Sequence, residues 1–451
     1  MPAASLAVRT LVVLFPLALD LAAQGAGRPA PGPVFGGPAA ASPGTFPGAG
    51  TRLQGPVSPP PPAKPIGIAY DRFRTLLWAA TENSLNDGRP DLFALLPSNL
   101  SVFTSIVLDE LPCTPAGPAV IDGWVDEVAV LDDGSLLLDD YNGDLMRFDD
   151  TLFEIDPSAP QLVRNVWYLD SSSCPATCRP NTNANLPQDS IGNVAGLAVR
   201  QTTIASPMQQ IWIGAFVPSG FIKRVQLTPG CPGSWLRVSS TPVPFAGACD
   251  GLEWDPDLQS FWMASSSTSL VYETRLDLTT GAFTLLQGFP GQGNGATGIS
   301  PIGGTAGPHE LVECLFFPTP AFYRSHSGHV GRGTPVINDP VGAGPISVGV
   351  QQGPGVAGRT AVALASITNF TGIPLDSERT LPFDPDALLA LMLQLRFSVT
   401  LGAAGTGTIG IPISLPPGVG PFQVGYVVLG DPVYDLLGVA RVSRAVSHTT
   451  R

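Results

Sequence analysis

Cysteine thiols are the side chains in this sequence with the most definite chemistry. The chain has 6 cysteines, and an even number is typical of an exported protein in which they form disulfides. Six cysteines allow 15 different pairings, so sequence spacing only suggests which of them pair. The spacing suggests a tight loop closed by Cys174 and Cys178 and a hairpin joined by Cys231 and Cys249, which leaves Cys113 and Cys314.

A metal site is the second chemistry that these residue types could support. Cys174 and Cys178 have a ligand-like spacing, but no second Cys or His pair has a matching one, so disulfides are favoured. His326 and His329 form the other candidate pair, with His309 nearby in the sequence. An exposed connector rich in Gly and Ser explains that segment better. The sequence also lacks the Gly-x-Ser-x-Gly motif of a serine nucleophile.

Five copies of one short pattern must position any site between residues 65 and 325. Each copy begins at a small or turn residue and continues as an alternating apolar strand, which a second strand rich in Trp, Phe or Leu follows. Repeats of roughly 40–50 residues built from short strands are typical of a β-propeller. We predict an all-β fold with five to six blades, because the irregular last copy could contain a sixth. The copies begin at Gly67, Glu127, Gly196, Gly251 and Gly298.

Several aromatic and acidic residues in the repeats have ordinary structural explanations. Asp250 precedes a glycine, which is more typical of a turn or a strand end than of a metal ligand. The segment Asp139–Gly143 resembles part of a calcium-binding loop but lacks the later bidentate Glu, so we interpret it as a turn. Four tryptophans recur at strand positions and predict packing between blades: Trp78, Trp212, Trp254 and Trp262.

The N-terminal residues predict export. Arg9 precedes an apolar run, Thr10–Leu19, and small residues follow up to Ala23. We predict a signal peptide over residues 1–23, because this run is shorter than the roughly 20 residues that cross a bilayer. Residues 24–64 are crowded with Gly, Pro and Ala and predict an extended linker. The protein is therefore expected to be secreted, extracellular or periplasmic.

Composition excludes several classes of partner. The chain has 51 Gly and 48 Pro among 451 residues, which favours many turns over long helices. Its net charge of −13 argues against binding to nucleic acid or to anionic membranes, both of which need clustered Lys and Arg. No later stretch is long and apolar enough to span a membrane. The expected partner is a protein or carbohydrate ligand outside the cytoplasm.

The repeat region resembles the secreted bacterial propellers of the NHL and gluconolactonase-like group over about residues 65–325. The resemblance rests on the phrase Asp250–Asp255 (Asp-Gly-Leu-Glu-Trp-Asp) and its weaker copies. In gluconolactonase-like enzymes a Glu, an Asn and an Asp bind a divalent metal at the mouth of the channel. Asp250 matches the Asp of that set, whereas Asn193 has a different offset from the family's Asn and the first repeat lacks the Glu. Glu253 and Asp126 lie near the channel ends of their strands and match no family ligand.

Residues 333–451 have a different sequence pattern from the repeats and predict a second domain, a β-sandwich. Short β-branched segments bounded by turns are typical of strands, and Asp384–Arg396 is the exception, with helical spacing. The region resembles a C-terminal β-sandwich module of large exported bacterial proteins. That resemblance implies a surface or secretion-associated module without chemistry. The matching phrases are Gly358–Ser366, Thr380–Asp384, Ile411–Pro416 and Gly438–Ser447.

The sequence favours an exported, non-catalytic binding protein with no cofactor. The alternative is a metal-dependent, lactonase-like hydrolase. In that case clustered acids would bind Ca²⁺ or Zn²⁺ and polarise a lactone carbonyl. Whether the chain is an enzyme stays open, with no enzyme favoured. The residues of the alternative site are Asp250, Asn193, Glu253 and Asp126.

Overall fold

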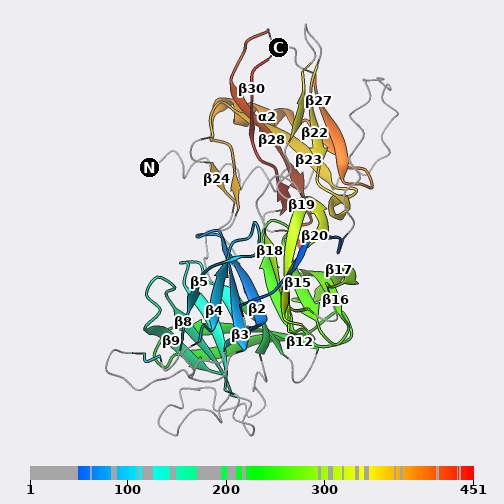
Figure 1. Ribbon diagram of the computed structural model, residues 1–451. Helices are drawn as coiled ribbons and strands as arrows, with labels where there is room; N and C mark the ends of the chain where they lie inside the picture. The colour runs from blue at the N-terminus through cyan, green and yellow to red at the C-terminus, as the bar shows by residue number, and fades with distance from the viewer. Residues whose placement is uncertain are drawn as a thin grey trace. The chain divides into compact units, whose positions relative to one another are not determined.

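The structure is a computed structural model, and two units of the chain are described separately. One unit contains Ala49–Gly304 and His309–Ser327, and the other contains Gly328–Arg451 (Figure 1). The predicted signal peptide lies outside the described residues. Those residues are 49–60, 63–82, 89–108, 111–113, 125–142, 149–169, 194–200, 210–215, 220–292, 296–302, 308–316, 319–330, 335–339, 345–369, 372–375, 379–412, 416–433, 435 and 438–450.

The first unit is a five-bladed β-propeller. Its innermost strands contact one another in a closed cycle, from blade 1 through blade 5 and back to blade 1. All five predicted repeat starts lie on these innermost strands, which confirms the repeat. Each blade is a four-stranded antiparallel sheet. From the innermost strand outwards, the blades are β2 (Lys64–Asp71), β3 (Leu76–Glu82), β4 (Leu92–Leu95) and β5 (Val102–Ile106); β6 (Val125–Val130), β7 (Leu136–Asn142), β8 (Asp149–Ile155) and β9 (Val163–Tyr168); β10 (Val194–Arg200), β11 (Gln210–Ala215), β12 (Phe221–Thr228) and β13 (Ser234–Pro242); β14 (Gly251–Asp255), β15 (Ser260–Ser265), β16 (Leu270–Leu276) and β17 (Phe283–Pro290); and β18 (Ala296–Ile302), β19 (Pro308–Leu315), β20 (Ala321–Val330) and β1 (Arg52–Val57).

Strand β1 closes the ring. It comes from the N-terminal side of the unit and forms the outermost strand of blade 5, where Arg52 faces Ser325 and Val57 faces Phe322 in antiparallel register. The prediction of a linker up to residue 64 is therefore wrong at its C-terminal end, because Arg52–Val57 is a paired strand.

Five separate apolar clusters, one at each junction between neighbouring blades, hold the ring together. Trp78 packs between blades 1 and 2, Trp212 and Trp254 between blades 3 and 4, and Trp262 between blades 4 and 5. The predicted packing role of the four tryptophans is confirmed. The predicted turn at Asp139–Gly143 is wrong, because residues 139–142 continue strand β7.

The second unit contains two main sheets that share one apolar core. Buried side chains of β22, β23, β27 and β28 meet in this core together with Met392 of helix α2. Among the described residues no helix is long and apolar enough to cross a membrane. The first sheet is β21 (Val336–Asn338), β22 (Ile346–Gln351) and β27 (Thr406–Ile411); the second is β26 (Ser398–Thr400), β23 (Thr360–Ser366), β28 (Phe422–Leu429) and β29 (Val439–Val442), with β30 (Val446–His448) also on β28; β24 (Ile373–Pro374) pairs with β25 (Thr380–Leu381), and α2 spans Ala387–Leu395.

Candidate functional site

The repeat starts share one position on the inner strands, and glycine is needed there because neighbouring strands approach closely. A Cβ atom on Gly67 would lie 2.7 Å from the Asp126 carbonyl oxygen and 2.8 Å from Glu127 Cα. A Cβ on Gly251 would lie 2.8 Å from the Thr297 carbonyl oxygen and 2.9 Å from Gly298 Cα. Real Cβ atoms do not approach other atoms so closely, so these glycines keep the inner strands together.

Glu127 is the only one of the five repeat starts that is not glycine, and it brings a carboxyl group into the interior of the propeller. It is 2% exposed and lies opposite Asp139, which is fully buried. The equivalent pairs are Gly196–Gly214 in blade 3 and Gly251–Ala264 in blade 4. Burial raises the pKa of Glu127 well above its ordinary value, and the charges of nearby acids raise it further. The break in the glycine pattern is the sequence signal that could have identified Glu127 as a special residue.

Three of the four predicted metal ligands lie near Glu127. Asp126, Glu253 and Asp250 all contribute to the raised pKa of Glu127, in that order. Asp126 and Asp250 occupy equivalent positions, because each directly precedes the repeat start of its blade. Asn193 lies outside the described residues. Among the residues that the structure describes, no three His, Cys, Asp or Glu side chains form a group that could hold a metal ion.

Asp250 has the structural role that its neighbouring glycine indicated. Its carboxylate accepts a hydrogen bond from the Ser266 backbone N–H at 2.5 Å, and its own N–H donates to the Ala264 carbonyl. Burial raises the pKa of Asp250, although the hydrogen bonds from Ser266 oppose that shift. The carboxylate thus fixes the connection after strand β15.

The predicted exposed connector at His326–His329 is wrong. Both histidines belong to strand β20, and both are buried. His309, on β19, bridges two blades: its Nε2 lies 2.8 Å from Asp255 Oδ2 and its Nδ1 lies 2.9 Å from Ser327 Oγ. The order Ser–His–Asp is that of a hydrolytic triad. Ser327 is fully buried, however, so its hydroxyl group does not face solvent from which a substrate could come.

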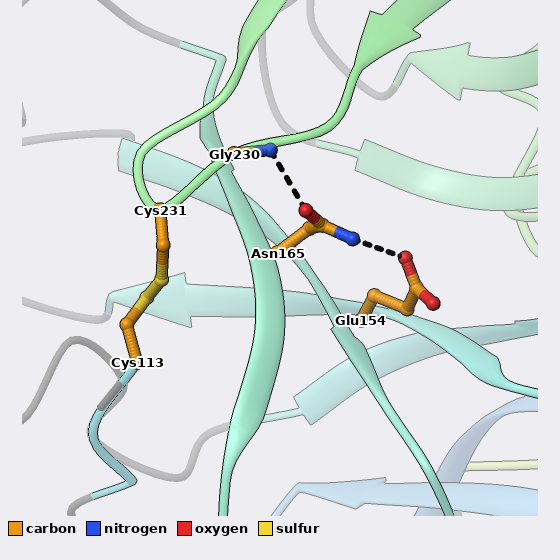
Figure 2. Close-up of a disulfide and its surroundings, with 5 residues drawn as sticks. All are labelled: Cys113, Glu154, Asn165, Gly230 and Cys231. Carbon is orange, nitrogen blue, oxygen red and sulfur yellow. Dashed lines mark hydrogen bonds between the residues drawn. A yellow bond between two sulfur atoms is a disulfide. The ribbon is translucent and has the colours of Figure 1, made fainter. Parts of the chain in front are cut away.

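The cysteines pair differently from the spacing prediction. Cys113 forms a disulfide with Cys231, with their Cα atoms 6.0 Å apart (Figure 2). The predicted Cys231–Cys249 pair is therefore wrong, and Cys249 and Cys314 are buried free thiols. Cys174 and Cys178 lie outside the described residues. A disulfide is consistent with an oxidising compartment.

The disulfide joins a loop of blade 3 to residues 111–113, and backbone hydrogen bonds hold the same loop against the outer strand of blade 2. The Val166 N–H donates to the Gly230 carbonyl at 3.0 Å, and the Gly233 N–H donates to the Val166 carbonyl at 2.7 Å. Figure 2 shows Asn165 accepting from the Gly230 N–H and donating to Glu154, both at 2.7 Å. The outer edge of β9 is therefore covered at Val166 by backbone groups of the neighbouring blade.

The outer edge of blade 1 has no such cover in the described part of the chain. Strand β5 ends the sheet, and its first four residues are all exposed. Phe103 is 64% exposed and Val102 is 40% exposed. The sequence Val-Phe-Thr-Ser-Ile contains neither a charged residue nor a proline, which are two of the usual means of blocking an edge strand, and its pairing with β4 has an irregularity between Val102 and Thr104. This edge is thus suited to pair with another extended segment.

Comparisons with known proteins show no family. No protein-family model matches the chain, and no curated protein matches it. Similar solved structures include the PQQ-bound aldose sugar dehydrogenase of Streptomyces coelicolor, with 12% identity, a TM-score of 0.35 and coverage of 61% of this chain and 97% of that chain. A chain of the mitotic checkpoint complex has 10% identity, a TM-score of 0.33 and coverage of 66% and 99%. The WD40 repeats of RRP9 have 11% identity, a TM-score of 0.30 and coverage of 66% and 78%.

Proposed function

We propose that this chain is a non-catalytic binding protein that acts outside the cytoplasm, and that a partner polypeptide pairs with the outer edge of blade 1. The observation that carries the proposal is the exposed and uncharged strand β5, whose outer edge no described residue covers. An extended peptide can add a strand to such an edge, with backbone hydrogen bonds for affinity and alternate side chains for specificity. The contrast with the covered edge of β9 supports a specific role for β5.

The chemistry of β5 favours a polypeptide over a carbohydrate. Its edge offers backbone N–H and C=O groups in strand spacing, flanked by the exposed side chains of Val102 and Phe103. The net charge of −13 favours a partner segment that is neutral or basic. The disulfide and the signal-like N-terminus support a location outside the cytoplasm.

The lactonase-like alternative has less support. Such a hydrolase needs several carboxylate or amide groups that converge on one metal ion. The charges of Asp126, Glu253 and Asp250 raise the pKa of Glu127, but the carboxylate of Asp250 accepts a hydrogen bond from the Ser266 backbone. We therefore do not assign a catalytic role to these acids.

Selection of displayed peptides on the immobilised full chain tests the proposal. We expect the chain to select peptides with alternating apolar residues, and Phe103→Lys to lose this binding by at least about tenfold. Phe73→Lys is the matched control, because Phe73 is also 64% exposed but lies in a turn of the same blade. Equal binding by Phe103→Lys and the unmodified chain would refute the proposal, and so would failure to select any peptide.

A further inference from the structure

Helix α2 of the second unit has two apolar faces, and in the described part of the chain only one of them is covered. Asp386 caps its N-terminus by accepting the Leu389 N–H at 2.9 Å, and Arg396 ends it in a left-handed conformation with φ 52°. Leu389 and Met392 are buried in the two apolar clusters of the unit. The inward face therefore fixes the helix on the β-sheet.

The outward face carries no charge. Leu391 and Leu395 lie one turn apart on it and are each 45% exposed. None of the nine residues of the helix is charged, whereas the outer face of a surface helix is usually polar. Ile367, which is 57% exposed, lies near the N-terminus of the helix, because its N–H donates to Asp386 Oδ2. The exposed residues of the face are Ala387, Ala390, Leu391, Gln394 and Leu395.

The two ends of this face have opposite charges. Asp384 and Asp386 lie at the N-terminal end, and Arg396 lies exposed at the C-terminal end. The helix is about 14 Å long, so these charges are well separated along its axis. A second copy placed antiparallel would bring each Arg396 to the acidic end of its partner and would also align the helix dipoles favourably. A parallel copy would place like charges together.

We propose that this face of α2 mediates association of two copies of the chain in antiparallel orientation. In a two-fold arrangement centred on the helix, Leu391 meets its own counterpart, and Leu395 lies against Ala387 of the second copy. Small Ala side chains opposite Leu allow two helices to approach closely. One short helix buries much less than the roughly 1,200 Å² of a standard interface, so the association is weak.

Sedimentation equilibrium of the full chain over a range of about 1–200 µM tests this association. We expect a reversible monomer–dimer equilibrium for the unmodified chain and a loss of dimer for Leu391→Lys. Arg396→Glu should weaken the dimer, because it places an acid at both ends of the helix. Val336→Lys is the matched control: Val336 is 63% exposed on β21 of the same unit and should leave the dimer unchanged.

Cysteine substitutions report the orientation. Under mild oxidation, Leu391→Cys should form a disulfide-linked dimer, whereas Leu395→Cys should not, because position 395 faces position 387 of the other copy. Linkage through both positions would indicate parallel helices and overturn the proposal. A chain that stays monomeric throughout the range would also overturn it and would assign the face to a different occupant. None of these outcomes involves β5, so they do not bear on the proposed function.

Discussion

The indole N–H of Trp78 donates a hydrogen bond to Asp71 Oδ2 at 3.0 Å and so joins the end of the innermost strand of blade 1 to the next strand. Asp255 and Trp262 repeat this bond in blade 4, at 3.2 Å and with the same seven-residue separation. Each aspartate also accepts N–H groups of the turn that follows it. The pair therefore fixes the first hairpin of a blade.

Replacing Asp71 by Ala should destabilise the propeller by about 2–4 kcal/mol, because four hydrogen bonds to a buried carboxylate are lost and the indole N–H is left unpaired. These bonds come from the Phe73 and Arg74 N–H groups, the Arg74 guanidinium and Trp78. Urea unfolding of the full chain measures the loss. Asp277→Ala is the control, because Asp277 accepts two turn N–H groups in an exposed turn without a tryptophan. A similar loss in both variants would show that the indole bond is unimportant.

The positions of the repeat starts could be predicted because they depend on local sequence. Each inner strand combines a small residue with alternating apolar residues, and the two features recur in each copy. The helix at Asp384–Arg396 was also predictable, since Asp386 provides the cap and the Leu run provides the buried face. Both predictions are confirmed.

Features that depend on distant partners were not predictable. Strand β1 contains Gly55 and Pro56 and lacks apolar alternation, so only its pairing with β20, some 270 positions away, makes it a strand. The Cys113–Cys231 pair spans a sequence separation of 118 and forms because a loop of blade 3 folds over blade 2. The break in the glycine pattern marks Glu127 in the sequence, but its proximity to Glu253 and Asp250 of blade 4 could not be predicted from its own repeat.

Gly298→Ala should destabilise the propeller by about 1–3 kcal/mol, because the ring has no room for another methyl group. A Cβ on Gly298 would contact the Ile66 carbonyl oxygen and lie 2.6 Å from Cys314 Sγ. Gly410→Ala is the control: it is a strand glycine with nothing within 4 Å of its added Cβ. Thermal and urea unfolding should show little change for Gly410→Ala. An unchanged stability of Gly298→Ala would contradict the close packing of the inner strands.

Removing the disulfide with Cys113→Ser and Cys231→Ser together should lower the free energy of unfolding by about 2–5 kcal/mol, because the bond restricts the unfolded chain. In the unmodified chain, Cys249 and Cys314 should be unreactive towards thiol reagents while the protein is folded, because burial raises the pKa of both thiols. Mass spectrometry after labelling in denaturant, without reductant, should find both of these cysteines modified and Cys113 and Cys231 protected. Labelled Cys231 in that experiment would disprove the disulfide.

The Asp255–His309 pair should make the propeller sensitive to acid. Burial by itself raises the pKa of Asp255, but the charge and hydrogen bond of His309 outweigh it, with smaller contributions from Arg72 and the Leu258 N–H, and the net pKa lies below the ordinary value of 3.8. An aspartate with a lowered folded pKa contributes stability above its unfolded pKa and loses it as pH falls towards the folded value. The difference in unfolding free energy between the unmodified chain and Asp255→Asn should therefore shrink as the pH falls below the ordinary aspartate range.

His309→Gln should shrink this loss of stability on acidification, because without the charge of His309 burial raises the folded pKa of Asp255 towards its unfolded value. Urea unfolding at a series of pH values, for the unmodified chain and both variants, measures the effect. Ser327→Ala tests the other side of the imidazole. It removes the hydroxyl group next to Nδ1 of His309 but keeps the contact between His309 and Asp255, so the loss of stability at low pH should be unchanged. If His309→Gln and the unmodified chain lose the same amount of stability as the pH falls, His309 does not hold the pKa of Asp255 down.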